Sequence, residues 1–171
     1  VRKKDKSPLG SSSLSKFSIF YFSILLLANY PPINSNKKVK NVNIMISEDR
    51  LLSFKMKLEF LRERMVNLEV WTKNVNKETF ISDSNLQYRY GIYHAFQLSI
   101  EVMRDLTAMM MRDLNYLPKG DNHNIDKLVE KRVISSDLGI DLKEGIELRQ
   151  NIVHNFNELN DSIVFERILN L

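Results

Sequence analysis

The polar residues best suited to chemistry lie together near the end of the sequence, in RQNIVHNF, residues 149–156. A guanidinium such as that of Arg149 can neutralise two phosphoryl oxygens, and His154 can take up or release a proton near neutral pH. Gln150 and Asn151 add amides to a cluster that could hold phosphate. Five positions of an α-helix turn through about 140°, however, so Arg149 and His154 would lie on different faces of one helix. The spacing alone is equally compatible with a helix end whose two side chains face solvent.

A second polar group, His94, Glu101 and Asp105, recurs at positions i, i+7 and i+11, which places one imidazole and two carboxylates on one helix face. A metal site is one interpretation. A carboxylate-bridged site in a bundle, however, usually draws matching Glu and Glu-x-x-His residues from other helices, and the sequence supplies no such second motif. We therefore favour a solvent-facing polar strip, with an interface or supporting role as the alternative, and expect neither a metal nor another cofactor.

The composition is that of one globular domain, and the net positive charge lies in the first 44 residues. The 171 residues contain no cysteine, which excludes disulfides, Cys-ligated metals and a thiol nucleophile. A reducing compartment fits this, and we expect a cytoplasmic protein. Residues 1–44 hold eight Lys or Arg against one Asp, whereas residues 45–171 hold seventeen against twenty acidic residues, a net charge of −3. The overall basicity is therefore no evidence that the folded part binds nucleic acid.

The first 44 residues differ in character from the rest. The apolar run Phe17–Ala28 is shorter than the roughly 20 residues that span a membrane, but it suits a signal-peptide core behind a basic start. Met45 lies two residues before Ser47, a plausible helix cap, and would serve as a natural start. We expect residues 1–44 to be a disordered or wrongly assigned extension, with a signal or anchor segment as the alternative, and no membrane association of the folded domain, residues 45–171.

Two long amphipathic helices follow from the spacing of apolar residues, which advances by alternating steps of three and four. The first stripe comprises Leu51, Phe54, Leu58, Leu61, Met65, Leu68 and Thr72, and the second comprises Leu86, Tyr90, Tyr93, Phe96, Ile100, Met103, Thr107, Met110 and Leu114. Two such helices of similar length imply antiparallel neighbours in a bundle. The predicted fold is all-α, an antiparallel up-and-down bundle of four to five helices.

Shorter helices complete the predicted bundle and carry the polar cluster. They are expected at residues 124–131, 136–154 and 161–171, the last two with Ser136 and Asp161 as N-caps. Gly139 and Gly145 each weaken the helix of residues 136–154 by up to about 1 kcal/mol relative to Ala. Close helix approach or mobility near the cluster would explain them. No strand pattern and no Gly-rich phosphate loop occurs in the sequence.

The combination of features resembles a known family. It consists of two long antiparallel helices, an E-x-x-x-D step on the second (Glu101, Asp105), and R-x-x-x-x-H with an aromatic two residues beyond the His. LRQNIVHNF is also similar to the LRN-x-x-VH-x-Y of the HepT-like branch of the HEPN superfamily. Members of this branch are toxins of minimal nucleotidyltransferase toxin–antitoxin pairs. The resemblance extends over about residues 45–171.

The resemblance implies a metal-independent ribonuclease that acts as a homodimer on RNA and is paired with a cognate minimal nucleotidyltransferase antitoxin. His154 would activate the ribose 2′-hydroxyl or protonate the leaving 5′-oxygen, and Arg149 of one protomer would stabilise charge on the phosphorane beside His154 of the other. Gln150 and Asn151 would orient the phosphate or the histidine. Glu101 would brace Arg149, with Asp105 as a further supporting residue.

Two residues depart from the family pattern. Gln150 stands where the family has Asn after the Arg, and Phe156 stands where it has the Tyr whose hydroxyl the antitoxin modifies with AMP. Phenylalanine cannot accept a nucleotidyl group. Three hypotheses therefore stay open: a ribonuclease toxin, a non-catalytic HEPN module that binds a nucleotidyltransferase, and a metal-dependent bundle enzyme using the His94 strip.

Overall fold

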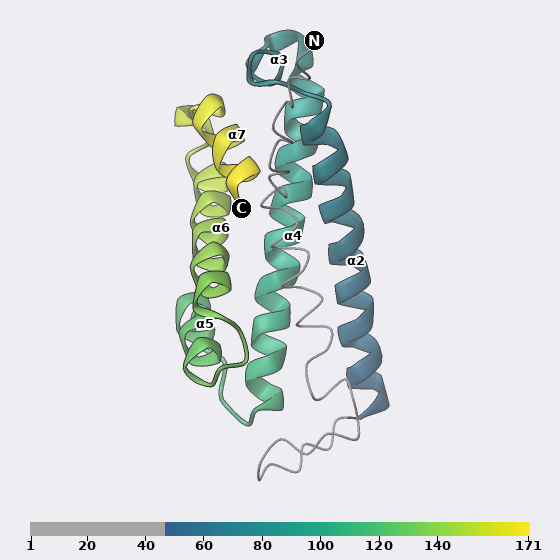
Figure 1. Cartoon of the computed structure of the whole chain (residues 1–171), viewed down its shortest axis with the longest axis vertical. Coiled ribbons are helices and arrows are strands. Elements are labelled where there is room, and N and C mark those ends of the chain that lie inside the picture. The colour runs from purple at the N-terminus through teal and green to yellow at the C-terminus, as the bar shows by residue number, and fades with distance from the viewer. Residues whose placement is uncertain (1–46) are drawn as a thin grey trace, which may run out of the picture.

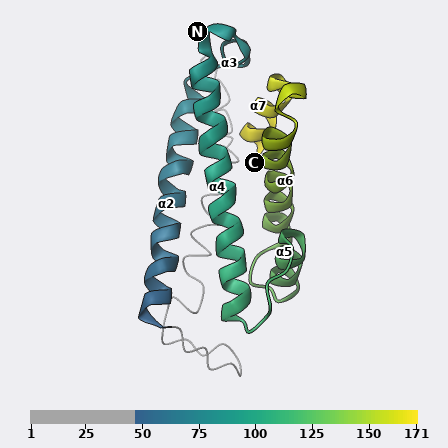
Figure 2. The ribbon, with the colours of Figure 1, turned by 180° about the vertical axis from the view of Figure 1, so that it is seen from behind.

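A computed structural model describes residues 47–171, and this part of the chain forms an all-helical bundle without strands (Figure 1). The predictions for residues 1–44 lie outside the described residues. Two long antiparallel helices pack side by side, and the helices of residues 121–130 and 136–154 line the other side of the second one, as the reverse view also shows (Figure 2). The α-helices are α2 (Glu48–Lys73), α3 (Lys77–Ile81), α4 (Leu86–Asp113), α5 (Asp121–Glu130), α6 (Ser136–His154) and α7 (Asp161–Asn170).

Helix α2 begins and packs as its sequence predicts. The Ser47 hydroxyl accepts a hydrogen bond from the Arg50 backbone N–H at 3.3 Å, and two acidic residues follow it in the first turn. Its stripe is buried at five positions, Phe54, Leu61, Met65, Leu68 and Thr72. Burial against α4 thus confirms the predicted pair of long antiparallel helices.

The predicted burial of the second apolar stripe, on α4, is wrong at the N-terminal end of the helix. Leu86 and Tyr90 of α4 are exposed, whereas the stripe is buried from Tyr93 to Met110. The first turns of α4 lie where α2 has ended and α6 is ending, so fewer neighbours cover them. Tyr90 is consequently a surface residue, close to the polar end of α6.

The connection between the long helices, predicted to be a break, contains a short helix. Asn76 caps the five-residue helix α3 by accepting from the Thr79 N–H at 2.8 Å. Phe80 of α3 is fully buried and stacks on Phe165 of α7, with 4.4 Å between ring centroids. Residues 47–171 therefore form six α-helices rather than four to five, because one buried aromatic anchors a helix too short to show periodicity.

Two predicted N-caps are each wrong by one residue. The cap of α6 is Ser135, whose hydroxyl accepts from the Leu138 N–H at 3.2 Å, and Ser136 is the first helical residue. The cap of α7 is Asn160 rather than Asp161. In both cases two adjacent residues can accept the bond, and the one with extended backbone angles becomes the cap.

The two glycines of α6 mark close helix approach. A Cβ atom at Gly145 would lie 2.7 Å from Cδ1 of Ile100 on α4, and one at Gly139 would lie 2.7 Å from Cγ2 of Val129 near the end of α5. These glycines let α6 approach both neighbours closely. Among residues 47–171, no helix has the length and apolar character needed to cross a membrane.

Candidate active site

Arg149 and His154, the predicted catalytic pair, lie on the last two turns of α6 and point in different directions. Arg149 is partly buried, with 23% of its side chain exposed, and reaches towards α4. His154 is the last residue of α6 and is exposed. Within residues 47–171 no hydrogen bond joins the two side chains, as the turn of about 140° between them predicts. One chain therefore does not bring Arg149 and His154 together.

Glu101 of α4 is the partner of Arg149. One of its carboxylate oxygens pairs with Nη2 of Arg149, and both accept from Nη1 of Arg104, at 3.1 and 3.0 Å. Arg104 in turn donates from Nε to Oδ2 of Asp121 at 2.8 Å. Two guanidinium groups and two carboxylates therefore alternate across α6, α4 and α5. This arrangement fixes the Arg149 side chain against α4, the contact that the resemblance implied for Glu101.

Asp105 lies on the same face of α4 but belongs to a separate contact. Its Oδ2 accepts from Nζ of Lys57 on α2 at 2.6 Å. His94 is exposed on α4 without joining either carboxylate. Among residues 47–171, no three His, Asp or Glu side chains lie close enough together to hold a metal ion. The three residues of the predicted strip are thus used separately, two as ion-pair partners of neighbouring helices.

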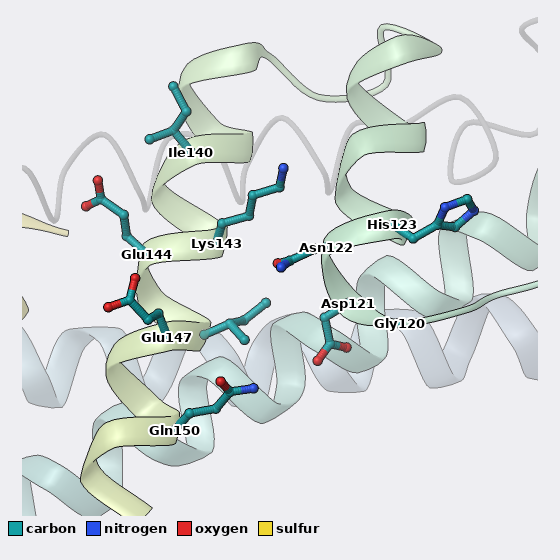
Figure 3. A pocket seen from close by; sticks show the side chains of 10 residues that line it. Gly120, Asp121, Asn122, His123, Ile140, Lys143, Glu144, Glu147 and Gln150 are labelled. Atoms are coloured by element: carbon teal, nitrogen blue, oxygen red, sulfur yellow. The ribbon is translucent and has the colours of Figure 1, made fainter. Parts of the chain in front are cut away.

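The amides beside His154 lie on two different surfaces. Asn155 ends α6 by donating its backbone N–H to the Asn151 carbonyl at 3.0 Å, and its Nδ2 donates to Oδ1 of Asn151 at 3.3 Å. Gln150 instead faces an open hollow of about 480 Å³ between α6 and the start of α5 (Figure 3). Asn151 and Asn155 can therefore meet a ligand at His154, whereas Gln150 belongs to the neighbouring surface.

The hollow itself is poorly suited to phosphate. Three of its lining side chains are acidic, Asp121, Glu144 and Glu147, against one lysine, Lys143, whose Nζ already pairs with Asp126 at 2.5 Å (Figure 3). A surface with this charge repels polyanions rather than attracting them. No sequence pattern predicts the hollow, because its residues come from two helices and share no motif.

Phe156 contacts a residue that the sequence analysis did not link to the site. The short 3-10 turn η2 (Phe156–Glu158) follows α6, and the Phe156 ring lies against the ring of Tyr90, with 5.6 Å between centroids and 59° between planes. The Phe156 residue is 46% exposed and Tyr90 is 42% exposed. Tyr90 lies three helical turns before Glu101, on the same line of α4. That spacing is the signal that could have identified it.

Known proteins give a consistent set of similarities. A family model described as Ribonuclease HepT-like matches residues 59–170. One Archaeoglobus fulgidus protein named "Putative RNase" is 31% identical over 108 residues, 63% of this chain and 81% of that protein. Another of the same name is 30% identical over 78 residues, 46% of this chain and 59% of that protein's length. A Methanocaldococcus jannaschii protein with a similar name is 29% identical over 75 residues, 43% of this chain and 86% of its own. No solved structure is significantly similar.

Proposed function

The chain belongs to the ribonuclease HepT-like family, and from this membership we propose that it cleaves RNA with Arg149 and His154 as its catalytic residues. The observation that carries the proposal is the ion pair in which Glu101 holds Arg149 against α4, close to the end of the helix that exposes His154. A guanidinium held in place and an exposed imidazole at the end of the same helix supply a fixed positive charge and a proton carrier. These are the two functions that cleavage of a phosphodiester requires.

The proposed reaction uses the RNA's own 2′-hydroxyl as the nucleophile. His154 takes the hydroxyl proton or delivers a proton to the leaving 5′-oxygen, a role worth about 10²–10⁴ in rate. The 2′-oxygen bonds to phosphorus, the bond to the 5′-oxygen breaks, and the products carry a 2′,3′-cyclic phosphate and a 5′-hydroxyl. Arg149 stabilises the charge on the phosphorane. The chemistry needs no metal ion, so we propose a metal-independent reaction.

We further propose that the active enzyme is a homodimer with composite sites. Arg149 and His154 face different sides of α6, so one phosphate cannot meet both from the same chain. A two-fold dimer brings each motif beside its copy. Arg149 would then act together with His154 of the partner subunit. The different directions of the two side chains support this proposal.

The biological setting that we propose is a toxin restrained by a cognate minimal nucleotidyltransferase. Phe156 has no hydroxyl to modify, so restraint at this position would act through binding rather than nucleotidyl transfer. The same residue, together with the net charge of −3 over residues 45–171, favours the second candidate function, a non-catalytic module that binds the nucleotidyltransferase. Stable co-purification with that partner, without cleavage by the free chain, would select this second candidate.

A mixing experiment tests catalysis and the composite site together. The full chain is incubated with single-stranded RNA in EDTA, and the products are analysed for cyclic phosphate. His154→Ala and Arg149→Ala should each cleave about 10²-fold or more slowly than wild type, whereas an equal mixture of the two, after subunit exchange, should recover about a quarter of the wild-type rate. That fraction arises because about half the dimers are mixed and each mixed dimer keeps one intact site.

Two outcomes would contradict the proposal at different points. Cleavage that survives in the His154→Ala variant would remove the proposed catalysis. A mixture as inactive as its components, despite confirmed subunit exchange, would leave catalysis in place but remove the composite site.

A further inference from the structure

Tyr90 and Phe156 form the only ring-to-ring contact on the surface of residues 47–171, and Phe156 lies two residues beyond His154 in the chain. The contrast with the Phe80–Phe165 pair is clear, because those two rings are buried and join α3 to α7. Tyr90 and Phe156 each keep close to half of their surface exposed. Their contact therefore contributes little to the core, and its exposed ring surface is available to a ligand.

The two rings are held in place by the structure around them. Tyr90 lies within α4, directly between Arg89 and Gly91, and Arg89 is fixed by Asp161 at the start of α7, with 3.1 Å between Nη1 and Oδ2. Phe156 starts η2, where the Glu158 N–H donates to the Asn155 carbonyl at 2.9 Å. Both rings are thus attached to backbone that is hydrogen-bonded on each side. A surface arranged in advance binds a ligand with a smaller loss of conformational freedom.

The surroundings of Phe156 are polar. The residues that adjoin it in the chain are His154, Asn155, Asn157 and Glu158, all exposed. A protein-binding patch is usually a continuous apolar area with a polar rim. Exposed Leu86 lies one turn before Tyr90 and exposed Val153 precedes His154, but the side chains between Val153 and Phe156 are an imidazole and an amide rather than a continuous apolar run. Aromatic rings beside hydrogen-bonding amides are the surface on which unpaired nucleobases stack.

We infer that Tyr90 and Phe156 form a stacking platform for one unpaired nucleobase of an RNA, next to the phosphate at His154; the inference rests on the proposed ribonuclease function. The amide pair of Asn151 and Asn155, joined by one hydrogen bond, leaves further amide donors and acceptors for the edge of the base. Duplex RNA keeps its bases paired and stacked, so the platform selects single strands. It tolerates different bases, because every base offers a π-face.

The inference also explains how phenylalanine can occupy position 156. Stacking needs an aromatic face and not a hydroxyl, so Phe156 retains this role although it cannot be nucleotidylated. Either ring can be exchanged for the other aromatic without loss of the platform. Removal of a ring should have a much larger effect.

Binding of an uncleavable RNA tests the platform separately from catalysis. The probe is a fluorescent single-stranded oligonucleotide with 2′-fluoro riboses, which lack the attacking hydroxyl, and binding to the full chain is followed by anisotropy. Tyr90→Ala and Phe156→Ala should each weaken binding by about tenfold, within the range measured for single stacking contacts. Tyr90→Phe and Phe156→Tyr should bind within about twofold of wild type because the rings remain. Leu117→Ala, at an exposed apolar residue beyond the far end of α4, is the matched control and should bind as wild type does.

The outcomes separate this inference from the proposed function. Unchanged binding in both alanine variants, with cleavage of natural RNA retained in the wild type, would overturn the platform and leave the ribonuclease standing. A wild-type chain that neither binds the probe nor cleaves natural RNA would overturn the proposed function and the platform with it. Conversion of the alanine variants from dimer to monomer in sedimentation would also overturn the platform, because the rings would then be a subunit contact.

Discussion

Two arginines of this protein each meet a carboxylate on a neighbouring helix, yet their surroundings differ. Arg89 is 7% exposed, and its Nη1 faces Oδ2 of Asp161 at 3.1 Å and the Ile81 carbonyl at 2.9 Å. Asp161 also accepts from the Tyr93 hydroxyl at 2.5 Å. Arg149 is more exposed and meets Glu101. Residues 47–171 supply neither Nε atom with a hydrogen-bond partner, so this feature does not distinguish the two arginines.

The two arginines differ in the groups of the protein that each guanidinium binds. Arg89 binds a carboxylate and the backbone that ends α3, so it ties α3, α4 and α7 together. The carboxylate opposite Arg149 is shared with Arg104, and 23% of the Arg149 side chain is exposed. A buried charge that is paired with a carboxylate and a carbonyl is costly to remove, whereas a charge with a replaceable partner is available to a ligand. The first arrangement is typical of structural arginines and the second of functional ones.

The largest expected effect is the loss of activity in Arg149→Ala. Without the guanidinium, the charge on the phosphorane loses its main stabiliser, and cleavage should fall about 10²–10³-fold. The free energy of unfolding should change by less than about 1 kcal/mol, because Glu101 keeps Arg104 as a partner at the protein surface. Single-turnover cleavage and urea unfolding measure the two quantities. A stability loss as large as that expected for Arg89 would remove the distinction between the two arginines.

The reverse result is expected for Arg89→Met. Its removal leaves Asp161 partly buried without its cation and should lower the free energy of unfolding by about 3 kcal/mol. Cleavage per folded molecule should stay close to wild type, since Arg89 takes no part in the proposed chemistry. Arg112→Met, at an exposed arginine of the same helix, is the control and should change stability by no more than about 0.5 kcal/mol. Equal losses at the two positions would show that burial of Arg89 does not matter.

The sequence predicts the contact of Arg149 better than that of Arg89. The stripes of α2 and α4 are long, so their period is clear, and the family resemblance points to the contact between Glu101 and Arg149. Arg89 and Asp161 lie 72 positions apart without a motif, and the arginine is buried where α3 and α7 meet the start of α4. Helix α3 was missed because five residues show no period. Tyr90 was predicted to be buried, because periodicity places a residue on a helix face but not opposite a neighbour.

Alkaline pH should lower the free energy of unfolding through Tyr93, which shares Asp161 with Arg89. Burial, and then the hydrogen bond that its hydroxyl donates to Asp161, raise the pKa of Tyr93 above its usual value near 10. The folded state keeps the Tyr93 proton to higher pH than the unfolded chain does. This contribution to stability is therefore complete below pH about 10 and is lost above it, at up to about 1.4 kcal/mol per pH unit.

Urea unfolding between neutral pH and pH about 11 measures this slope. Tyr93→Phe should show a shallower decline than wild type, because it removes the titrating group while retaining the ring. The pKa of Tyr88 is also raised, by burial, but Tyr88 is present in both proteins and cancels in the difference. Identical slopes would mean that the hydroxyl of Tyr93 is not held by Asp161 in solution.

A small change in stability, and a finer test of how Arg149 is positioned, is expected from Gly145→Ala. A Cβ there would lie 2.7 Å from Cδ1 of Ile100, which must shift, while alanine gains up to about 1 kcal/mol of helix propensity. The two effects oppose each other, so the free energy of unfolding should change by about 1 kcal/mol or less. The rate of cleavage should fall by more than the small loss of folded protein explains. The reason is that Ile100 adjoins Glu101, and Arg149 lies one turn beyond Gly145.

Gly139→Ala makes the same kind of contact on the other side of α6, since its Cβ would lie 2.7 Å from Cγ2 of Val129. It should therefore have a similar effect on stability and leave cleavage unchanged, because Gly139 contacts α5 rather than α4 and lies ten residues before Arg149. Small displacements of catalytic groups are enough to reduce rates strongly. If both alanines reduced cleavage equally, the distance between α6 and α4 at Gly145 would not be what positions Arg149. The two arginines would then differ only in how many groups of the fold they bind.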